Sequence, residues 1–339
     1  MITPRTRRRL GFGALAAGVG ALAGYVGQRR MSDRWRADQA ALEAVRLVLD
    51  DRLVHRHIPV SDGGSIHVVE TGSGPPIVLV HGVTLSVITW ARQLNGLSAD
   101  HRVIAIDQRG HGPSAAGTDG YGLDRLSEDV IEVLGALDVT GAVLVGHSLG
   151  GMVTMTAAIN SRDRLADHVT GLALVATSSH PLAGVPVPPS VIDRLSARGE
   201  RSLARAERRC HPAIRSASML TWSMRVAYGS RPDPTAIELG RTMMTAMSPA
   251  SLGSLLRGIG SFKLKDHLGT IDLPTRVVVG TRDVLTPPRH AKAMMAEGIP
   301  HAELVVLPGT GHMVMLECPE ELNTMLHEFS VVVTKGRPT

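Results

Sequence analysis

The chain is poor in aromatic residues and in cysteine. Only 3% of its 339 residues are Phe, Trp or Tyr, so Ala, Val, Leu and Met supply most of the 43% hydrophobic content. Its two cysteines, Cys210 and Cys318, lie far apart, and two isolated cysteines do not make a disulfide framework. The composition therefore excludes a small disulfide-stapled protein. The length allows one large α/β domain with an insertion, or two small domains.

The chain also lacks a basic surface pattern outside its first residues. The formal net charge is +5, but residues 1–36 hold eight arginines and a single acid, Asp33. The remaining residues carry 28 basic and 30 acidic side chains. No basic stripe interleaved with aromatic residues occurs, and the sequence therefore predicts no nucleic-acid partner.

Residues 1–30 are interpreted as a membrane anchor or a signal segment. An uncharged, Gly- and Ala-rich run at residues 10–28 lies between two groups of arginines. It is long enough for a membrane span, and Ala21-Leu22-Ala23 fits a signal cleavage site. We expect a membrane-anchored or exported protein, whereas a segment of neither kind would leave a cytoplasmic core. Residues 31–56 carry apolar residues at helical spacing and predict an amphipathic connecting helix.

From residue 57 onward, short apolar runs alternate with helical patterns. A hairpin with turn residues at 61–64 comes first, and the later runs read as strands buried on both faces. These runs are at residues 77–80, 102–107, 142–145, 172–175, 276–279 and 304–307. Strands that alternate with helices predict an α/β fold with a mostly parallel central sheet flanked by helices. We assign this core to residues 57–180 and 274–333.

Residues 181–273 contain no buried-strand run. This stretch is punctuated by proline, rich in methionine and helical in pattern. It predicts a helical cap, inserted before the penultimate main strand. Methionines such as Met243 could line an adaptable apolar pocket or could simply belong to the core.

A candidate nucleophile lies in the run Gly146-His147-Ser148-Leu149-Gly150. The run follows an apolar strand pattern and opens a helical stretch, which is the setting of a G-x-S-x-G nucleophile elbow. A serine on so sharp a turn has strained backbone, and only glycines on either side leave room for the neighbouring chain. The hydroxyl of Ser148 is then held clear of the sheet.

Further motifs follow other predicted strands, where the carboxyl ends of parallel strands gather loops at one edge. Asp283 follows the strand after the cap, whereas Asp266 and Asp272 precede it. His312 lies between glycines after the last strand. The order Ser148, Asp283, His312 is the chain order of α/β-hydrolase triads. The motifs at these strand ends are His81-Gly82-Val83, residues 107–114 (DQRGHGPS), Gly280-Thr281-Arg282-Asp283 and Gly309-Thr310-Gly311-His312.

On these motifs the chain resembles the α/β-hydrolase fold family, in the branch that carries a helical cap. The resemblance covers roughly residues 57–330. It implies a nucleophile at Ser148, a general base at His312 and an orienting acid at Asp283. It also implies that the backbone N–H groups of Val83 and Leu149 form the oxyanion hole. It implies neither a metal nor an organic cofactor.

The other motif residues are assigned supporting roles. We expect His81 to brace the oxyanion loop, and Asp107 and Arg109 to pin loops rather than to touch substrate. Trp90 is a candidate substrate-binding residue at the edge of the pocket, with plain packing as the alternative.

The resemblance favours a carboxylic-ester hydrolase of esterase or lipase type, acting on a small-molecule or lipid-like ester. The same triad could instead act on amide or peptide, thioester or lactone bonds, or as a cofactor-free perhydrolase. A membrane-tethered binding protein that retains the fold is a third hypothesis. Family members with a cap that open epoxides or displace halide use an aspartate at the nucleophile position, so Ser148 speaks against those reactions.

Overall fold

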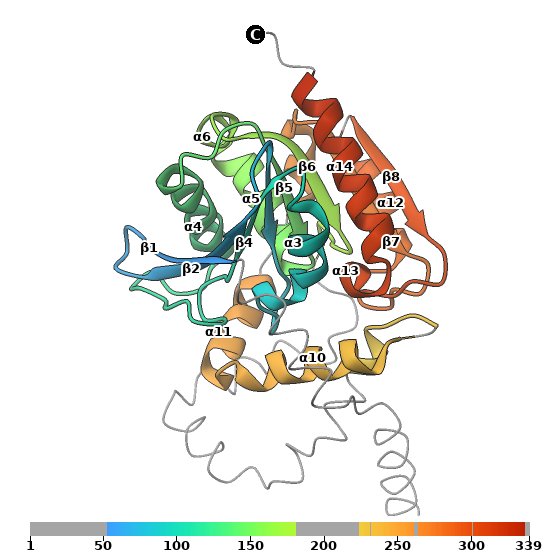
Figure 1. Cartoon of the computed structure of the whole chain (residues 1–339), viewed down its shortest axis with the longest axis horizontal. Coiled ribbons are helices and arrows are strands. Elements are labelled where there is room, and N and C mark those ends of the chain that lie inside the picture. Colours follow the sequence, from blue (N-terminus) through green and yellow to red (C-terminus); the bar gives the residue numbers. More distant parts are fainter. Residues whose placement is uncertain (1–52, 181–223, 231, 261–263, 300, 336–339) are drawn as a thin grey trace, which may run out of the picture.

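The computed structural model describes residues 53–180, 224–230, 232–260, 264–299 and 301–335. Its centre is an eight-stranded sheet in the order β1-β2-β4-β3-β5-β6-β7-β8 (Figure 1). Antiparallel pairing joins β1 to β2 and β2 to β4, and every later pair is parallel. The strands are β1 (Val54–Pro59), β2 (Ser65–Thr71), β3 (Pro76–Val80), β4 (Arg102–Ile106), β5 (Ala142–His147), β6 (Val169–Val175), β7 (Thr275–Gly280) and β8 (Ala302–Leu307). The predicted fold class is confirmed, because each apolar run became a strand.

Helices cover both faces of the sheet and bury the apolar strand residues. One apolar cluster packs α4, α5 and α12 against one face, and a second packs α3 and α14 against the other. Both faces of β5 and β6 are buried, which is why these strands read as unbroken apolar runs. The helices and 3-10 turns of this core are η1 (Val87–Trp90), α3 (Ala91–Leu97), α4 (Leu123–Ala136), α5 (Leu149–Asn160), α6 (Arg162–Ala166), α12 (Pro288–Glu297), α13 (Val314–Glu317) and α14 (Pro319–Lys335).

A helical segment separates β6 from β7, as the sequence predicts. Its described elements are α10 (Pro234–Ala246), α11 (Pro249–Gly260) and η2 (Lys265–Thr270), and α10 and α11 lie together at one end of the sheet (Figure 1). The side chain of Asp233 accepts a hydrogen bond from the Thr235 amide at 2.9 Å, and Pro234 occupies the first turn. This N-cap hydrogen bond from Asp233 and the proline at the first turn explain why α10 begins where it does. Residues 181–223 of the predicted cap lie outside the described residues.

The predicted connecting helix at residues 31–56 is wrong at its end. Residues 54–56 belong to β1, where Val54 pairs with Glu70 across the hairpin. Cross-strand pairing satisfies the backbone groups there, and this outweighs the weak helical spacing of the preceding residues. Residues 31–52 and the predicted anchor or signal segment at residues 1–30 lie outside the described residues. Within the described ranges, no helix is long and apolar enough to cross a bilayer.

Candidate active site

Ser148 occupies the sharp turn between β5 and α5. Its backbone has φ 52° and ψ −114°, a positive-φ conformation that costs a non-glycine residue energy. A side chain at Gly146 would collide with the Gly150 carbonyl oxygen, and one at Gly150 would collide with the carbonyl of Val80. The two glycines are therefore required by close backbone approach, and the predicted elbow geometry is present.

Asp283 and His312 meet across the loops that follow β7 and β8. The Nδ1 atom of His312 lies 2.9 Å from Oδ2 of Asp283, and both side chains are buried. The hydroxyl of Thr286 donates to the same Oδ2 at 2.7 Å, and the amides of Leu285 and Thr286 donate to Oδ1 at 2.8 Å. Four donors thus fix one carboxylate, which holds the imidazole ring of His312 in place.

The electrostatics of this pair keep Asp283 ionised. Burial alone would raise the pKa of the Asp283 carboxyl, but His312 and the hydrogen bonds from Thr286 hold that pKa well below its usual range. An ionised carboxylate can only accept, so Nδ1 of His312 carries the proton. The Nε2 atom of His312 is then the basic nitrogen of the ring.

A buried histidine joins the His312 loop to the elbow. His147, which precedes Ser148, donates from Nε2 to the His312 carbonyl at 3.0 Å. The two imidazole rings lie 4.8 Å apart between centroids. Ser148 and His312 are only 3% and 5% exposed. Among the described residues no hydrogen bond links the Ser148 hydroxyl to His312, and such bonds are often long without a substrate.

One predicted oxyanion donor, Leu149, directly follows the nucleophile, and the other, Val83, directly follows Gly82. Leu149 is the first residue of α5, so its N–H has no acceptor within the helix. On the other side, a Cβ added to Gly82 would lie 3.1 Å from Cβ of Ser148. Gly82 therefore passes directly against the nucleophile, and Val83 is the next residue along the loop; the donor roles of Val83 and Leu149 stay predictions.

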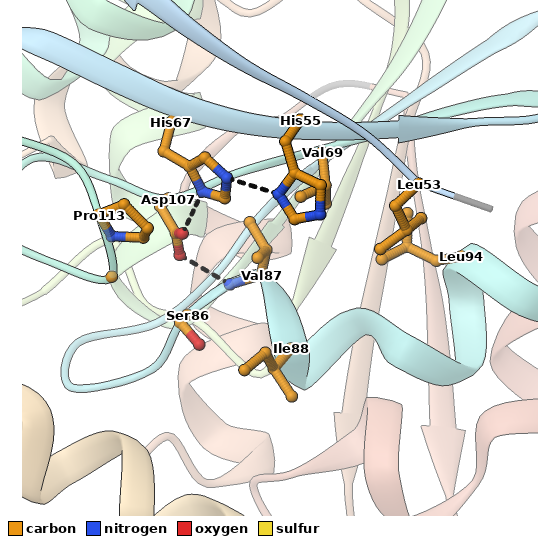
Figure 2. Close-up of a pocket in the computed structure, with 11 residues that line it drawn as sticks. Leu53, His55, His67, Val69, Ser86, Val87, Ile88, Leu94, Asp107 and Pro113 are labelled. Carbon is orange, nitrogen blue, oxygen red and sulfur yellow. Dashed lines mark hydrogen bonds and ion pairs between the residues drawn. The ribbon is translucent and has the colours of Figure 1, made fainter. Parts of the chain in front are cut away.

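His81 and Asp107 hold the loop that carries Val83. His81 donates from Nδ1 to the Gly82 carbonyl at 2.7 Å and accepts from the Gln108 amide at 3.1 Å. Burial lowers the pKa of His81, so it serves as a neutral brace. Asp107 accepts from the Val87 amide at 2.8 Å and from Nδ1 of His67 at 2.7 Å (Figure 2). These contacts bear out the supporting roles expected for His81 and Asp107.

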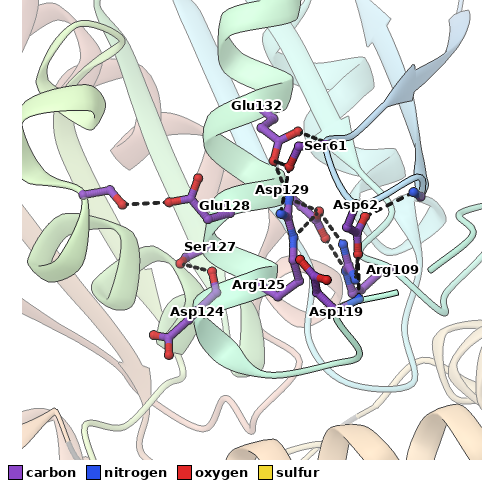
Figure 3. A network of polar contacts seen from close by, with 12 residues as sticks. Ser61, Asp62, Arg109, Asp119, Asp124, Arg125, Ser127, Glu128, Asp129 and Glu132 are labelled. Carbon is purple, nitrogen blue, oxygen red and sulfur yellow. Dashed lines mark hydrogen bonds and ion pairs between the residues drawn. The ribbon is translucent and has the colours of Figure 1, made fainter. Parts of the chain in front are cut away.

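Arg109 fixes the loop after β4 through ion pairs with two buried carboxylates. Its fully buried guanidinium binds Asp129 through two hydrogen bonds of 2.6 and 2.7 Å, and binds Asp62 at 2.9 Å (Figure 3). The hydrogen bond and the charge of Arg109 hold the pKa of Asp62 well below its usual range. Because the guanidinium is wholly engaged inside the protein, Arg109 has the structural role that the sequence indicates.

Trp90 is fully buried at the end of η1, inside the second apolar cluster. Among the described residues, it lines neither the cavity beside His55 and His67 nor the cavity next to α10, so its position fits the packing alternative. One of these cavities, of about 160 Å³, lies between α10 and the loop after β3. Its apolar lining includes Leu85, Ile88, Met243 and Met247. Cap methionines therefore do line a pocket.

Three contributors were not assigned roles from the sequence: His147, Thr286 and Glu317. The Glu317 carboxylate accepts from the Gly229 amide at 2.7 Å and from the Gly311 amide at 3.0 Å, so it ties the cap to the His312 loop. Thr286 follows Asp283 by three residues, a spacing typical of a local side-chain turn, and could have been found from that signal. Glu317 gives no such local signal. In the part of the chain that the structure describes, no three His, Cys, Asp or Glu side chains are arranged to hold a metal ion.

Comparison with known proteins identifies the class. A model described as "Alpha/beta hydrolase family" matches residues 77–324, which is most of the chain. The chain belongs to the alpha/beta hydrolase family. It is thus a member of a family of hydrolase enzymes, as the sheet topology and the elbow lead one to expect.

Its relatives carry several names. The acetyltransferase component of the acetoin cleaving system of Pseudomonas putida is 32% identical over 259 residues, which cover 76% of this chain and 63% of that relative, less than two thirds of its length. A non-heme haloperoxidase of Rhodococcus erythropolis is 30% identical over 284 residues, which cover 80% of this chain and 98% of that protein. The solved structure of a thermophilic esterase from Thermogutta terrifontis is similar with a TM-score of 0.69 and 27% identity, over 83% of this chain and 99% of that one.

Proposed function

We propose that the chain is a serine hydrolase that cleaves a carboxylic ester through an acyl-enzyme. The observation that carries this proposal is the buried Asp283–His312 pair, 2.9 Å apart, whose loop is hydrogen-bonded to the residue next to Ser148. The strained backbone of Ser148 and the esterase among the similar structures support it. Membership in the family alone leaves the bond and the substrate open.

In the first half of the reaction, Ser148 Oγ attacks the ester carbonyl carbon while Nε2 of His312 takes the hydroxyl proton. The negative charge moves to the carbonyl oxygen, which the N–H groups of Val83 and Leu149 stabilise. Asp283 stabilises the imidazolium that forms. His312 then gives its proton to the leaving alcohol, and the carbon–oxygen bond breaks.

In the second half, water replaces the alcohol. His312 takes a proton from the water, whose oxygen attacks the acyl carbon of the Ser148 ester. The oxyanion forms in the same place and collapses, and the proton returns to Oγ of Ser148 as the acid departs. No step uses a metal or an organic cofactor.

The cavity beneath α10 favours a substrate with a small apolar group. At about 160 Å³ it adjoins Leu85, two residues beyond the proposed oxyanion donor Val83, and methionine is an adaptable lining residue. We assign the acyl chain to this cavity. Met243→Ala should therefore move the preferred p-nitrophenyl ester to a longer chain. An unchanged chain-length profile would place the acyl group elsewhere.

The proposal is tested by labelling with a fluorescent fluorophosphonate, followed by turnover of p-nitrophenyl esters. The wild type should be labelled, whereas Ser148→Ala and His312→Ala should not. Turnover in Ser148→Ala should fall by about 10³-fold or more. Ser98→Ala, which changes a half-buried serine outside the site, is the matched control and should behave as wild type. Unchanged turnover in Ser148→Ala contradicts the proposal.

A second candidate reaction uses the same acyl-enzyme. The similarity to a protein named non-heme haloperoxidase favours perhydrolysis, in which hydrogen peroxide replaces water and releases a peracid. Halide oxidation that depends on both acetate and peroxide and is lost in Ser148→Ala would identify this activity. Amide, thioester and lactone substrates are distinguished by including them in the ester panel. Absence of labelling in every form would instead favour the non-catalytic binding protein.

We also propose that residues 10–28 direct the chain to a membrane or to export. The support is the apolar run between two groups of arginines. The full chain and a form that begins at Met31 should differ when cells are fractionated. Equal distribution between the soluble and membrane fractions, with an unprocessed N-terminus, would contradict both the anchor and the signal.

A further inference from the structure

A cluster of histidines lies on the β1–β2 hairpin, remote in sequence from Ser148. Residues two apart on a strand point to the same face, so His55 and His57 share one face of β1. His67 on β2 lies directly opposite His57 in the antiparallel register. The ring of His67 is 5.2 Å from that of His55 and 5.1 Å from that of His57, between centroids. Three imidazoles thus gather on one patch of the hairpin.

Two nitrogens of this cluster are joined by a hydrogen bond whose length is close to the spacing of two metal ligands. Nδ1 of His55 and Nε2 of His67 are 3.0 Å apart. Imidazole nitrogens bind Zn²⁺ at about 2.0–2.1 Å, so two of them subtending about 95–110° at the ion lie about 3.0–3.4 Å apart. A small opening of the pair would admit an ion between them.

A buried carboxylate stands behind the pair. Nδ1 of His67 donates to Oδ2 of Asp107 at 2.7 Å, which leaves the Nε2 lone pair of His67 directed at His55. Asp107 is itself held by the Val87 amide at 2.8 Å. Metal-binding histidines characteristically donate their second nitrogen to a carboxylate in this way, which fixes the tautomer and raises the basicity of the ligand.

The pair also has room beside it. Figure 2 shows His55, His67 and Asp107 in a row at the edge of a cavity of about 330 Å³, whose other lining residues are mostly apolar. This space can hold water ligands. In the described residues, no three His, Cys, Asp or Glu side chains already surround one point. Two histidines are therefore in place, and the remaining ligands must move toward the ion when it binds.

We propose that His55 and His67 bind a divalent transition-metal ion such as Zn²⁺, with exposed His57 and water completing its coordination. Neutral imidazole suits Zn²⁺, Ni²⁺ and Cu²⁺ rather than Mg²⁺ or Ca²⁺. His55 carries its proton on Nε2 when the ion is bound, having exchanged it from Nδ1 through solvent. The site is separate from Ser148 and does not depend on the proposed ester hydrolysis.

The structure offers a matched control in a second histidine pair. Nε2 of His101 lies 3.0 Å from Nδ1 of His327, but the other nitrogen of His101 bonds to the Pro75 carbonyl at 3.1 Å instead of a carboxylate. No third histidine ring is stacked on this pair among the described residues. The second pair should therefore bind the ion more weakly.

The test is calorimetric titration of the tag-free full chain with ZnCl₂ at pH 7.5, with MgCl₂ in parallel. One saturable Zn²⁺ site is expected, and no Mg²⁺ binding. His55→Gln changes an exposed side chain, and circular dichroism should show that the fold is kept. It should weaken Zn²⁺ affinity by at least about tenfold, since even changes in residues that only hydrogen-bond to metal ligands act on that scale. His57→Gln should weaken it less, and His327→Gln should leave it unchanged.

Three results would overturn the proposal. The first is the absence of a saturable Zn²⁺ site in the wild type. The second is wild-type affinity in His55→Gln, and the third is a loss in His327→Gln that His55→Gln does not show. Because binding heat is the readout, a failed esterase assay would not affect the conclusion.

Discussion

Two buried Asp–His pairs joined by a side-chain hydrogen bond lie close to the carboxyl ends of strands in the described part of the chain. Asp107 directly follows β4 and lies 2.7 Å from His67, and Asp283 follows β7 and lies 2.9 Å from His312. Each carboxylate joins Nδ1 of its histidine; Asp107 also accepts from one backbone amide and Asp283 from two. By contacts alone, the two pairs are built from the same parts.

The two pairs differ in the element that carries the histidine, a strand or a loop, and in the group next to that histidine on the side away from the carboxylate. His67 sits in the middle of β2, and its Nε2 already meets His55. His312 sits in a loop whose carbonyl is bonded to His147, the neighbour of Ser148. A carboxylate can orient an imidazole anywhere in a protein. The group next to the other ring nitrogen decides whether the pair can transfer a proton or bind a metal ion. The comparison separates a proposed proton-transfer pair from a proposed metal-binding pair.

The largest expected difference between the pairs is chemical. Asp283→Asn should lower kcat for p-nitrophenyl esters by about 10³–10⁴-fold, because an amide does not hold the imidazole of His312 in the reactive tautomer. The free energy of unfolding should also fall, by about 1–3 kcal/mol, because the new amide group places a donor against one of the groups that donate to Asp283. Steady-state kinetics on protein checked by circular dichroism measures the effect. A loss of less than tenfold would show that Asp283 does not orient the base.

The corresponding change in the other pair should act on stability. Asp107→Asn keeps the shape of the side chain but leaves a donor facing the Val87 amide or His67, which costs about 1–3 kcal/mol of unfolding free energy. Urea unfolding measures it. Per folded molecule, kcat should fall far less than in Asp283→Asn. An equal fall in kcat would mean that both carboxylates serve the same chemistry.

Buried histidines that are not hydrogen-bonded to a carboxylate should make the stability of the protein depend on pH. Burial lowers the pKa of His111 to about 3, and burial with the neighbouring His312 lowers that of His147 well below its ordinary value. Both stay neutral in the folded protein, whereas the unfolded chain protonates them below about pH 6.5. The unfolded state then binds more protons, so stability falls as the pH falls.

The slope of this loss approaches about 1.4 kcal/mol per pH unit for each such histidine below pH 6.5. Urea midpoints between pH 7.5 and 5.5 measure it. His111→Gln should have a shallower slope, and the exposed change His301→Gln serves as the control. Identical slopes in wild type and His111→Gln would mean that His111 is charged in the folded state.

The smallest expected effect concerns the tie between the cap and the His312 loop. Glu317→Gln retains one acceptor oxygen for the Gly229 and Gly311 amides and should cost about 1–2 kcal/mol. Burial raises the pKa of Glu317, so the loss of its negative charge in Glu317→Gln is not expected to add to this cost. Urea unfolding measures the loss. Glu320→Gln, an exposed change on α14, should be neutral, and equal losses in both variants would contradict the role of Glu317.

Local sequence was sufficient to predict the sheet and the elbow. The run at residues 142–145 is apolar on both faces because β5 is covered on both sides, and that pattern is visible without any tertiary information. Gly146 and Gly150 flank Ser148 because backbone passes within van der Waals distance of both. The end of the predicted helix at residues 31–56 failed because pairing of Val54 with Glu70 depends on a strand further along the chain.

Part of the site had no local signal. The order of Ser148, Asp283 and His312 along the chain named three residues, but their meeting place depends on how β5, β7 and β8 align in the sheet. The bond from His147 to His312 joins positions 165 residues apart. No period or motif encodes such a contact.

The sequence by itself therefore determined the family, the strands and the strained turn that carries Ser148. These features follow from side-chain size and apolar period, which act between near neighbours. Only the tertiary structure decided that Glu317 ties the cap to the His312 loop and that His55 faces His67. The reason is physical: hydrogen bonds and ligand spacings act over about 3 Å, and sheet register and loop paths bring distant residues that close.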